Sequence, residues 1–427
     1  MLRRLWSVTL GKDWYAAVTY SMKTQMLRLV IGLMLIGLVT ACGGPVAGSV
    51  VQSGKPRLAP DATQAEMDEQ VADNSTFAFD LYHNLRAERE GSFVYSPYSL
   101  SSALAMTYAG ARAETERQMA GTLGFALPPA RLHSVFNGLD LEMDQRGEGA
   151  KGKEGEGFRL TTVNALWGQD GYTFLSGFLD ILAEHYGTGL RLLDFESKPE
   201  QAREDINDWV SDQTEERIEA LIPEGAINAL TRLVLVNAIY FDAAWLDPFE
   251  PESTHEATFH LLDGGEVSVP MMTKRDSFHY AGGEGYQVVE VPYDGGELSM
   301  VVLLPESDRF EAFERSLDAG RVSEELQDLH PKDVRLSMPK FTLDSSTRLK
   351  QTLSDMGMPD AFLYQVADFS GMDGSREIFV GDVIHRAFVS VDEAGTEASA
   401  ASAVVLPATA RERPPPIEVT VDRPFVF

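Results

Sequence analysis

Two short patterns in this 427-residue chain have the residue types of a chemical site. Residues 147–152 read Gly-Glu-Gly-Ala-Lys-Gly, which matches the glycine spacing of a dinucleotide-binding turn. Such a turn requires a strand before it and a helix after it, whereas this one lies in the charged, glycine-rich stretch 144–157, which predicts a loop. His255, Glu256 and His260 are ligand types of a zinc peptidase, but the two histidines are five residues apart instead of one helical turn. We therefore interpret both patterns as ordinary surface segments.

The usual nucleophile motifs are also missing from the sequence. It contains no G-x-S-x-G elbow, and its single cysteine, Cys42, forms no Cys/His nucleophile pair. Scattered serine, histidine and aspartate residues have no catalytic meaning without geometry. The sequence therefore favours a protein that is not an enzyme, and we expect neither a cofactor nor a metal.

The stretch from Glu393 to Leu406 is the most informative part of the chain. It consists almost entirely of small side chains and follows residues 387–391, which predict a strand. With a period of two, one face carries small or apolar side chains that could be buried, namely Thr396, Ala398, Ala400, Ser402, Val404 and Leu406. The other face carries a single charge and could remain exposed to solvent; it consists of Glu397, Ser399, Ala401, Ala403 and Val405. The stretch is thus either a strand small enough to enter an existing sheet or a flexible Ala/Ser linker.

Composition and charge indicate a globular, acidic protein. Hydrophobic residues make up 44% and charged residues 24% of the chain, which is far from a disordered profile. The formal net charge is -29, and because residues 1–41 contribute +4 (five Lys/Arg and one Asp), the remainder carries -33. Such a chain does not offer a basic surface for nucleic acid.

Periodicity predicts alternating helices and strands after Asn74. We expect Asn74 or Ser75 to cap the first helix. The further predicted elements are helical regions at 99–119, 175–186 and 206–222, a strand at 160–167, and a hairpin of 286–292 with 298–305 around Asp294-Gly295-Gly296.

The N-terminal segment has the features of a bacterial lipoprotein signal. Lys23 and Arg28 precede an apolar run at 29–40, which is too short for a comfortable membrane span. Val39-Thr40-Ala41-Cys42 resembles a lipobox, in which the signal peptide is removed and the cysteine is acylated. We therefore expect a signal peptide at 1–41, with Met22 as an alternative start, a lipid on Cys42, and a polar tether at 42–72. The location would be the cell envelope or the extracellular space, on a bacterial membrane.

Six motifs in order resemble those of the serpins, the serine protease inhibitor family. The motifs are residues 93–100 with 103–106, 235–241 with Trp245 and 248–249, 339–341, 367–372, the small-residue stretch 393–406, and 418–427. The resemblance runs from about Asn74 to Phe427. It implies an α+β fold with three β-sheets, a helical half and an exposed reactive-centre loop, in a domain at 73–427. The family continues through one more strand after the motif that ends at Phe427, so we expect that strand to be absent.

The resemblance also implies a mechanism and the residues that carry it. Serpins are suicide substrates: a serine protease cleaves the loop, which then inserts into the central sheet and traps the acyl-enzyme. The hinge residues would be Glu393, Gly395, Thr396, Glu397, Ala398, Ser399, Ala400 and Ala401, and the polar cluster called the shutter would be Ser96, Ser99, Asn237 and His385. Glycine would let the backbone turn over at the hinge. The protein would act as a monomer.

Counting from Glu393 places the reactive bond at Thr409-Ala410, which suits a target of the elastase type. The rival bond is Arg411-Glu412, which suits a trypsin-like target. Two other readings stay open. One is a non-inhibitory serpin that acts as a binding module or a protease substrate, and the other is an inactive truncated fragment.

Overall fold

The computed structural model describes residues 48–146, 150, 159–396 and 414–427. The α-helices within these ranges are α2 (Gln64–Glu88), α3 (Pro97–Tyr108), α4 (Ala113–Leu123), α5 (Pro129–Gln145), α6 (Ser176–Tyr186), α7 (Pro199–Gln213), α8 (Phe310–Glu314), α9 (Ala319–Gln327), α10 (Lys350–Met356) and α11 (Ser370–Asp373). Two 3-10 helices are η1 (Pro251–Ser253) and η2 (Pro359–Phe362). The strands are β1 (Ser49–Val51), β2 (Arg159–Gln169), β3 (Leu190–Leu193), β4 (Leu233–Ala244), β5 (His255–His260), β6 (Glu266–Gly283), β7 (Tyr286–Pro292), β8 (Ser299–Pro305), β9 (His330–Pro339), β10 (Phe341–Arg348), β11 (Val380–Val391), β12 (Gly395–Thr396) and β13 (Ile417–Thr420).

The described strands form two sheets. A seven-stranded sheet has the order β1-β3-β2-β4-β12-β11-β10, and a six-stranded sheet has the order β13-β9-β6-β7-β8 with β5 paired to β6. The resemblance implied three sheets. Two of them are joined here because β6 is long enough to pair with β5 along its first part, with β9 along its middle and with β7 along its last part. The α+β class is confirmed.

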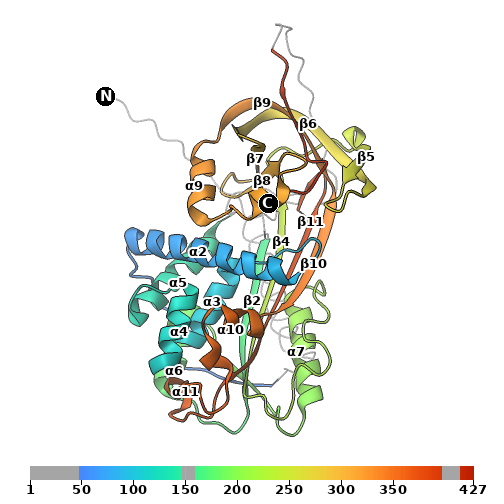
Figure 1. Ribbon diagram of the computed structural model, residues 1–427. Helices are drawn as coiled ribbons and strands as arrows, with labels where there is room; N and C mark the ends of the chain where they lie inside the picture. The colour runs from blue at the N-terminus through green and yellow to red at the C-terminus, as the bar shows by residue number, and fades with distance from the viewer. Residues whose placement is uncertain (1–47, 147–149, 151–158, 397–413) are drawn as a thin grey trace, which may run out of the picture. The chain divides into compact units, whose positions relative to one another are not determined.

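Three hydrophobic clusters cover the seven-stranded sheet, and β4 contributes to all of them. Leu233 and Leu235 face the helices α2 to α6, whereas Val234 and Val236 face α7 on the opposite side (Figure 1). Ala243, at the end of β4, packs against the six-stranded sheet. Covering on both faces explains why residues 233–239 read as a nearly continuous apolar run.

Most of the predicted elements lie where the periodicity placed them. The strand at 160–167, the helix at 175–186 and the hairpin of β7 and β8 are confirmed. The helical region 99–119 is two helices, α3 and α4, separated by a turn. The third predicted helix, 206–222, is shifted, since α7 ends at Gln213.

The start of the domain differs from our expectation. The first helix begins at Gln64, where the Thr63 hydroxyl accepts from the Glu66 N–H and the Glu66 carboxylate accepts from the Thr63 N–H. Asn74 does not cap a helix. It is buried within α2 and accepts hydrogen bonds from Gln70 and Ser101. Residues 48–62, which we expected to belong to a tether, already lie on the domain, since β1 adds an edge strand beside β3.

Candidate functional site

The line along which β4 and β11 meet, which we call the seam, is the first feature of the candidate site. The two strands pair directly and in parallel from Leu233 and Val380 to Tyr240 and Phe388. Beyond that point they are separated by β12, which lies antiparallel to both. A chain that continued β12 along the seam would therefore meet a row of backbone donors and acceptors on each side once the two strands part.

The two hinge residues in β12 fill the open end of this seam. A Cβ atom on Gly395 would lie 2.1 Å from the Ala243 carbonyl oxygen, so only glycine fits there. Its φ is not in the left-handed region, so our sequence argument, that glycine lets the backbone turn over, is replaced by one of close approach. Thr396 is fully buried, and its hydroxyl lies 2.8 Å from the Tyr293 hydroxyl. The Tyr293 ring stacks on Trp245 with centroids 4.6 Å apart.

Glu393 fixes the chain just before β12. Its carboxylate accepts from Lys340 Nζ at 2.7 Å and from the Thr254 hydroxyl at 2.8 Å, and its carbonyl accepts from the Phe249 N–H. Burial alone would raise the pKa of this carboxyl, but Lys340 and its other hydrogen-bond donors hold the pKa below the usual value. Glu393 is therefore charged at neutral pH and ties the start of the loop to β9 and β10 through the turn residue Lys340.

Hydrogen bonds of Trp245 and Asp392 complete this anchorage. The Trp245 indole N–H donates to the Asp392 carbonyl at 3.0 Å, and the Trp245 backbone N–H donates to the Ala394 carbonyl at 2.9 Å. The Asp392 carboxylate accepts from the N–H groups of Ala394 and Gly395. Sequence analysis recognised Trp245 and Lys340 only as parts of motifs and assigned them no role, because their partners lie 53 to 147 residues away.

The structure brings the four predicted shutter residues together beneath the seam. Asn237 Oδ1 lies against His385 Nδ1, and Asn237 Nδ2 donates to the Ser99 hydroxyl and to the Asn164 side-chain oxygen. Asn164, on β2, was not predicted. Ser96 takes part through its backbone N–H, which donates to His385 Nε2 at 3.0 Å, while its hydroxyl caps α3.

His385 is neutral in this cluster. Burial first, and then the positive charge of Arg89, lower the pKa of its imidazole to about 3. Because Nε2 accepts from Ser96, the ring proton resides on Nδ1 and is donated to Asn237. These short polar contacts join β4, β11 and α3, the elements that would have to separate if the seam opened.

Several predicted site residues lie outside the described ranges. They are the hinge residues Glu397, Ala398, Ser399, Ala400 and Ala401, the bond residues Thr409, Ala410, Arg411 and Glu412, and the lipidation residue Cys42. Their assignments stay predictions. None of the helices in the described ranges could cross a bilayer, since none is both long and apolar enough.

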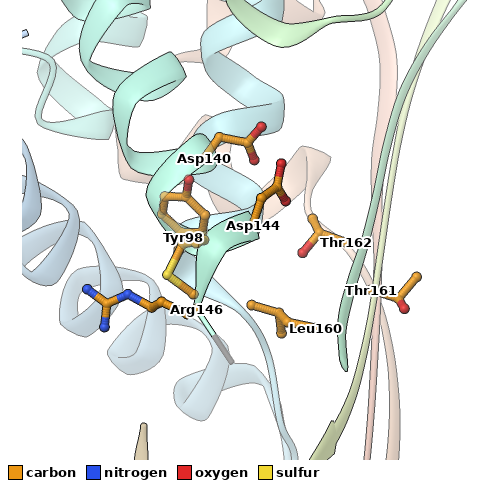
Figure 2. Close-up of a pocket in the computed structure, with 8 residues that line it drawn as sticks. Tyr98, Asp140, Asp144, Arg146, Leu160, Thr161 and Thr162 are labelled. Carbon is orange, nitrogen blue, oxygen red and sulfur yellow. The ribbon is translucent and has the colours of Figure 1, made fainter. Parts of the chain in front are cut away.

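A separate cavity of about 360 Å³ lies between the end of α5 and β2, away from the seam (Figure 2). Tyr98, Asp140 and Asp144 converge on it from α3 and α5. Asp140 is held by Arg57 at 2.6 Å. Burial first, and then the charge of Asp140, raise the pKa of the Asp144 carboxyl. Among the described lining residues, no nucleophile is paired with a base.

The α+β fold and the pairing of β12 between β4 and β11 agree with the family that the sequence motifs resemble. The family model for serpin (serine protease inhibitor) matches residues 72–427. The chain therefore belongs to the serpin family, whose members are typically protease inhibitors and not enzymes.

Relatives and solved structures agree with this assignment. The chain is 38% identical over 375 residues to leukocyte elastase inhibitor A of Rattus norvegicus, covering 84% of this chain and 95% of that protein. It is 38% identical over 355 residues to an uncharacterised serpin-like protein of Thermococcus kodakarensis, covering 83% and 80%. The structure is similar to native tengpin, a thermophilic serpin, with a TM-score of 0.75 and 26% identity over 88% of this chain and 92% of that one. It is also similar to uncleaved ovalbumin, with a TM-score of 0.73 and 25% identity over 83% and 93%.

Proposed function

We propose that this protein inhibits serine proteases by inserting its cleaved loop between β4 and β11. The observation that carries the proposal is β12, which already begins an antiparallel strand at one end of the seam. Loop insertion into a sheet is a known route of strand addition and of strain release in this family.

The register of β12 supports insertion of the whole small-residue stretch. Gly395 lies opposite Ala244 and Thr396 opposite Ala243, so each further loop residue would advance one position back along β4. Ten residues beyond Thr396 is Leu406, and ten residues before Ala243 is Leu233, the first residue of β4. The stretch therefore matches the length of the strand that would receive it.

The side chains of this register are compatible with their new neighbours. Residues directly opposite each other in an antiparallel pair share a face of the sheet. Ser402 would lie opposite Asn237 in the polar cluster, and Val404 would lie opposite Leu235 in the apolar core. Polar would meet polar and apolar would meet apolar, which favours a stable inserted form.

The same register places the bond residue beyond the sheet. Thr409, three residues after Leu406, would lie level with Leu230, just before β4 begins. An acyl-linked protease would thus be carried from the end of β4 at Ala244 to its start. A small threonine at the bond suits a protease of the elastase type, and relatives of this chain carry the name leukocyte elastase inhibitor.

Incubation with an elastase-like and a trypsin-like serine protease tests the proposal. We expect a complex that survives boiling in detergent, and a released C-terminal peptide that begins at Ala410. A peptide that begins at Glu412 would transfer the bond to Arg411. Cleavage with no stable complex at any ratio of the two proteins would instead identify a substrate.

We propose further that Cys42 carries a lipid in the mature protein. The support is the resemblance of residues 39–42 to a lipobox after a charged and then apolar leader. Mass spectrometry of the membrane fraction should find an acylated peptide that starts at Cys42. A longer N-terminus with an unmodified Cys42 inside it would contradict this proposal.

A further inference from the structure

The chain enters the domain through a segment that is firmly held. β1 pairs antiparallel with β3, with Val51 opposite Leu190. Asp180 of α6 accepts from the Ser53 hydroxyl at 2.6 Å, and its carboxylate lies 3.0 Å from Lys55 Nζ. Cys42 therefore lies only six residues before Gly48, where the held segment begins. The expected tether would have placed thirty residues between Cys42 and the domain.

This entry point lies at the end of the sheet away from the reactive loop. Arg191 of β3 pairs with Trp167 of β2, which pairs with Val234 near the start of β4. The loop leaves the sheet at Thr396, opposite Ala243 near the end of β4. Nine residues of strand separate the two levels, which corresponds to about 30 Å.

Exposed apolar side chains gather at the same end as the entry point. The exposed large ones located there are Val50, Leu175, Leu230, Leu363, Tyr364 and Val366. Leu230, which is 72% exposed, lies three residues before β4. The Tyr364 ring contacts Phe379, which directly precedes β11. Leu175 begins α6 and donates its N–H to Met372 of α11; both helices lie at the lower end of the sheet in Figure 1.

We propose that this end of the domain, the start of β4 and β11 with its exposed apolar side chains, rests on a lipid surface. The proposal rests on the proposed acylation of Cys42. Six residues span about 20 Å when fully extended, so an acylated Cys42 would hold this end against the membrane. Leucine, valine and tyrosine side chains suit the boundary between headgroups and acyl chains.

The chemistry of the lipid follows from the charge of the protein. Because the chain carries a formal charge of -29, anionic headgroups would repel it, and the contact is apolar rather than electrostatic. Zwitterionic lipid is the surface that fits. Thr396, the last described residue before the predicted reactive loop, lies about 30 Å farther up the sheet, at the end away from the bilayer.

The single cysteine permits a direct test. The chain from Cys42 to Phe427 is coupled through Cys42 to a maleimide with one acyl chain, because a single chain gives only marginal binding and leaves the protein's own contact measurable. The compact unit begins at Ala47, so the chain from Cys42 contains all of it. Partition into phosphatidylcholine vesicles is then measured by sedimentation.

The decisive comparison uses two triple variants of similar exposure. Leu363→Ser, Tyr364→Ser and Val366→Ser together should weaken partition by about tenfold or more. The control, Leu261→Ser, Leu262→Ser and Val267→Ser, removes exposed apolar side chains of the β5–β6 hairpin and should change partition by less than about twofold. Equal losses in both variants, or no loss in the first, would overturn the docking surface.

Two further measurements separate this inference from the proposals beneath it. Amide hydrogen exchange at 361–367 should slow on vesicles, while exchange at 261–267 should not change; the opposite pattern would refute the assigned orientation. Complex formation with a protease is measured on lipid-free protein, where both variants should match the wild type. Its absence in all three proteins would refute inhibition without affecting the docking result, and unacylated Cys42 in the native host would refute the anchor.

Discussion

Replacing Thr396 by arginine should convert the inhibitor into a substrate. Thr396 has no exposed surface, bonds to the Tyr293 hydroxyl at 2.8 Å, and lies between β4 and β11. An unpaired guanidinium in that position costs about 3 kcal/mol or more, so arginine would leave the sheet in the native state and would oppose re-entry after cleavage. A barrier raised by about 3 kcal/mol slows insertion by roughly 150-fold.

That delay is large enough to change the outcome of the reaction. If insertion in the wild type is about tenfold faster than hydrolysis of the acyl-enzyme, a 150-fold delay makes hydrolysis the faster step by about 15-fold. Thr396→Val leaves the Tyr293 hydroxyl without its partner at a cost of about 1 kcal/mol. Because this side chain is already buried before cleavage, the cost is present both before and after insertion, and inhibition should stay close to that of the wild type. Only arginine should abolish inhibition.

The assay is the number of inhibitor molecules consumed per protease molecule, together with the yield of detergent-stable complex. Thr342→Arg is the matched control, because it places the same side chain at an exposed position of β10 in the same sheet. It should inhibit like the wild type. If Thr396→Arg forms complex at the wild-type yield, the hinge does not enter the sheet at Thr396 and the register argument fails.

Three other perturbations follow from the contacts at the seam. The ion pair with Lys340 stabilises the fold by about 1 kcal/mol above the ordinary Glu pKa of 4.5, and Glu393→Gln should remove this contribution. The wild type loses the same contribution as the pH falls below 4.5, so the melting temperature of the variant should lack this part of the pH dependence. His385 stays neutral in the folded protein, whereas in the unfolded chain it gains a proton below its ordinary pKa of 6.5. The free energy of unfolding should therefore decrease by about 1.4 kcal/mol for each unit by which the pH falls from 6.5 towards 3. Urea unfolding of His385→Gln should show a pH dependence that is smaller by this one-proton contribution. The Arg386 guanidinium of β11 donates to the Ala220 carbonyl, after α7, at 2.8 Å. Arg386→Ala should therefore speed the uptake of a synthetic peptide of sequence 396–406, measured on native gels. An unchanged rate would show that this hydrogen bond does not restrain the seam.

Much of the fold could be predicted from the sequence because its motifs and periodic runs are local signals. The hairpin at Asp294-Gly295-Gly296 and the strand at 160–167 depend on neighbouring residues only. The entry segment was misread because a three-residue edge strand has too short a pattern to stand out among polar residues. One signal was overlooked: Thr63 and Glu66 have the spacing of a capping box and mark the true start of α2.

The site was predictable in its parts but not in its connections. Small residues at 393–406 indicated a segment that can enter a sheet, since size and period are properties of the segment itself. Its hydrogen-bond partners are Lys340, Trp245 and Tyr293. The tertiary arrangement of the two sheets brings these residues to the segment, so no local sequence pattern predicts them. Asn164 was missed for the same reason, because it joins the polar cluster only through the register of β2 with β4.

The docking proposal and the inhibitory proposal both involve the end of the sheet where β4 and β11 begin. Insertion would bring Thr409 level with Leu230, which is among the apolar side chains assigned to the lipid contact. A protease delivered there has to displace the bilayer, while about 20 Å of chain to Cys42 limits how far the domain can move away. Both proposals hold together only if the apolar contact is weak enough to be released by the free energy of strand insertion. A small group of apolar side chains on an acidic domain meets that condition, whereas a deeply inserted helix would not.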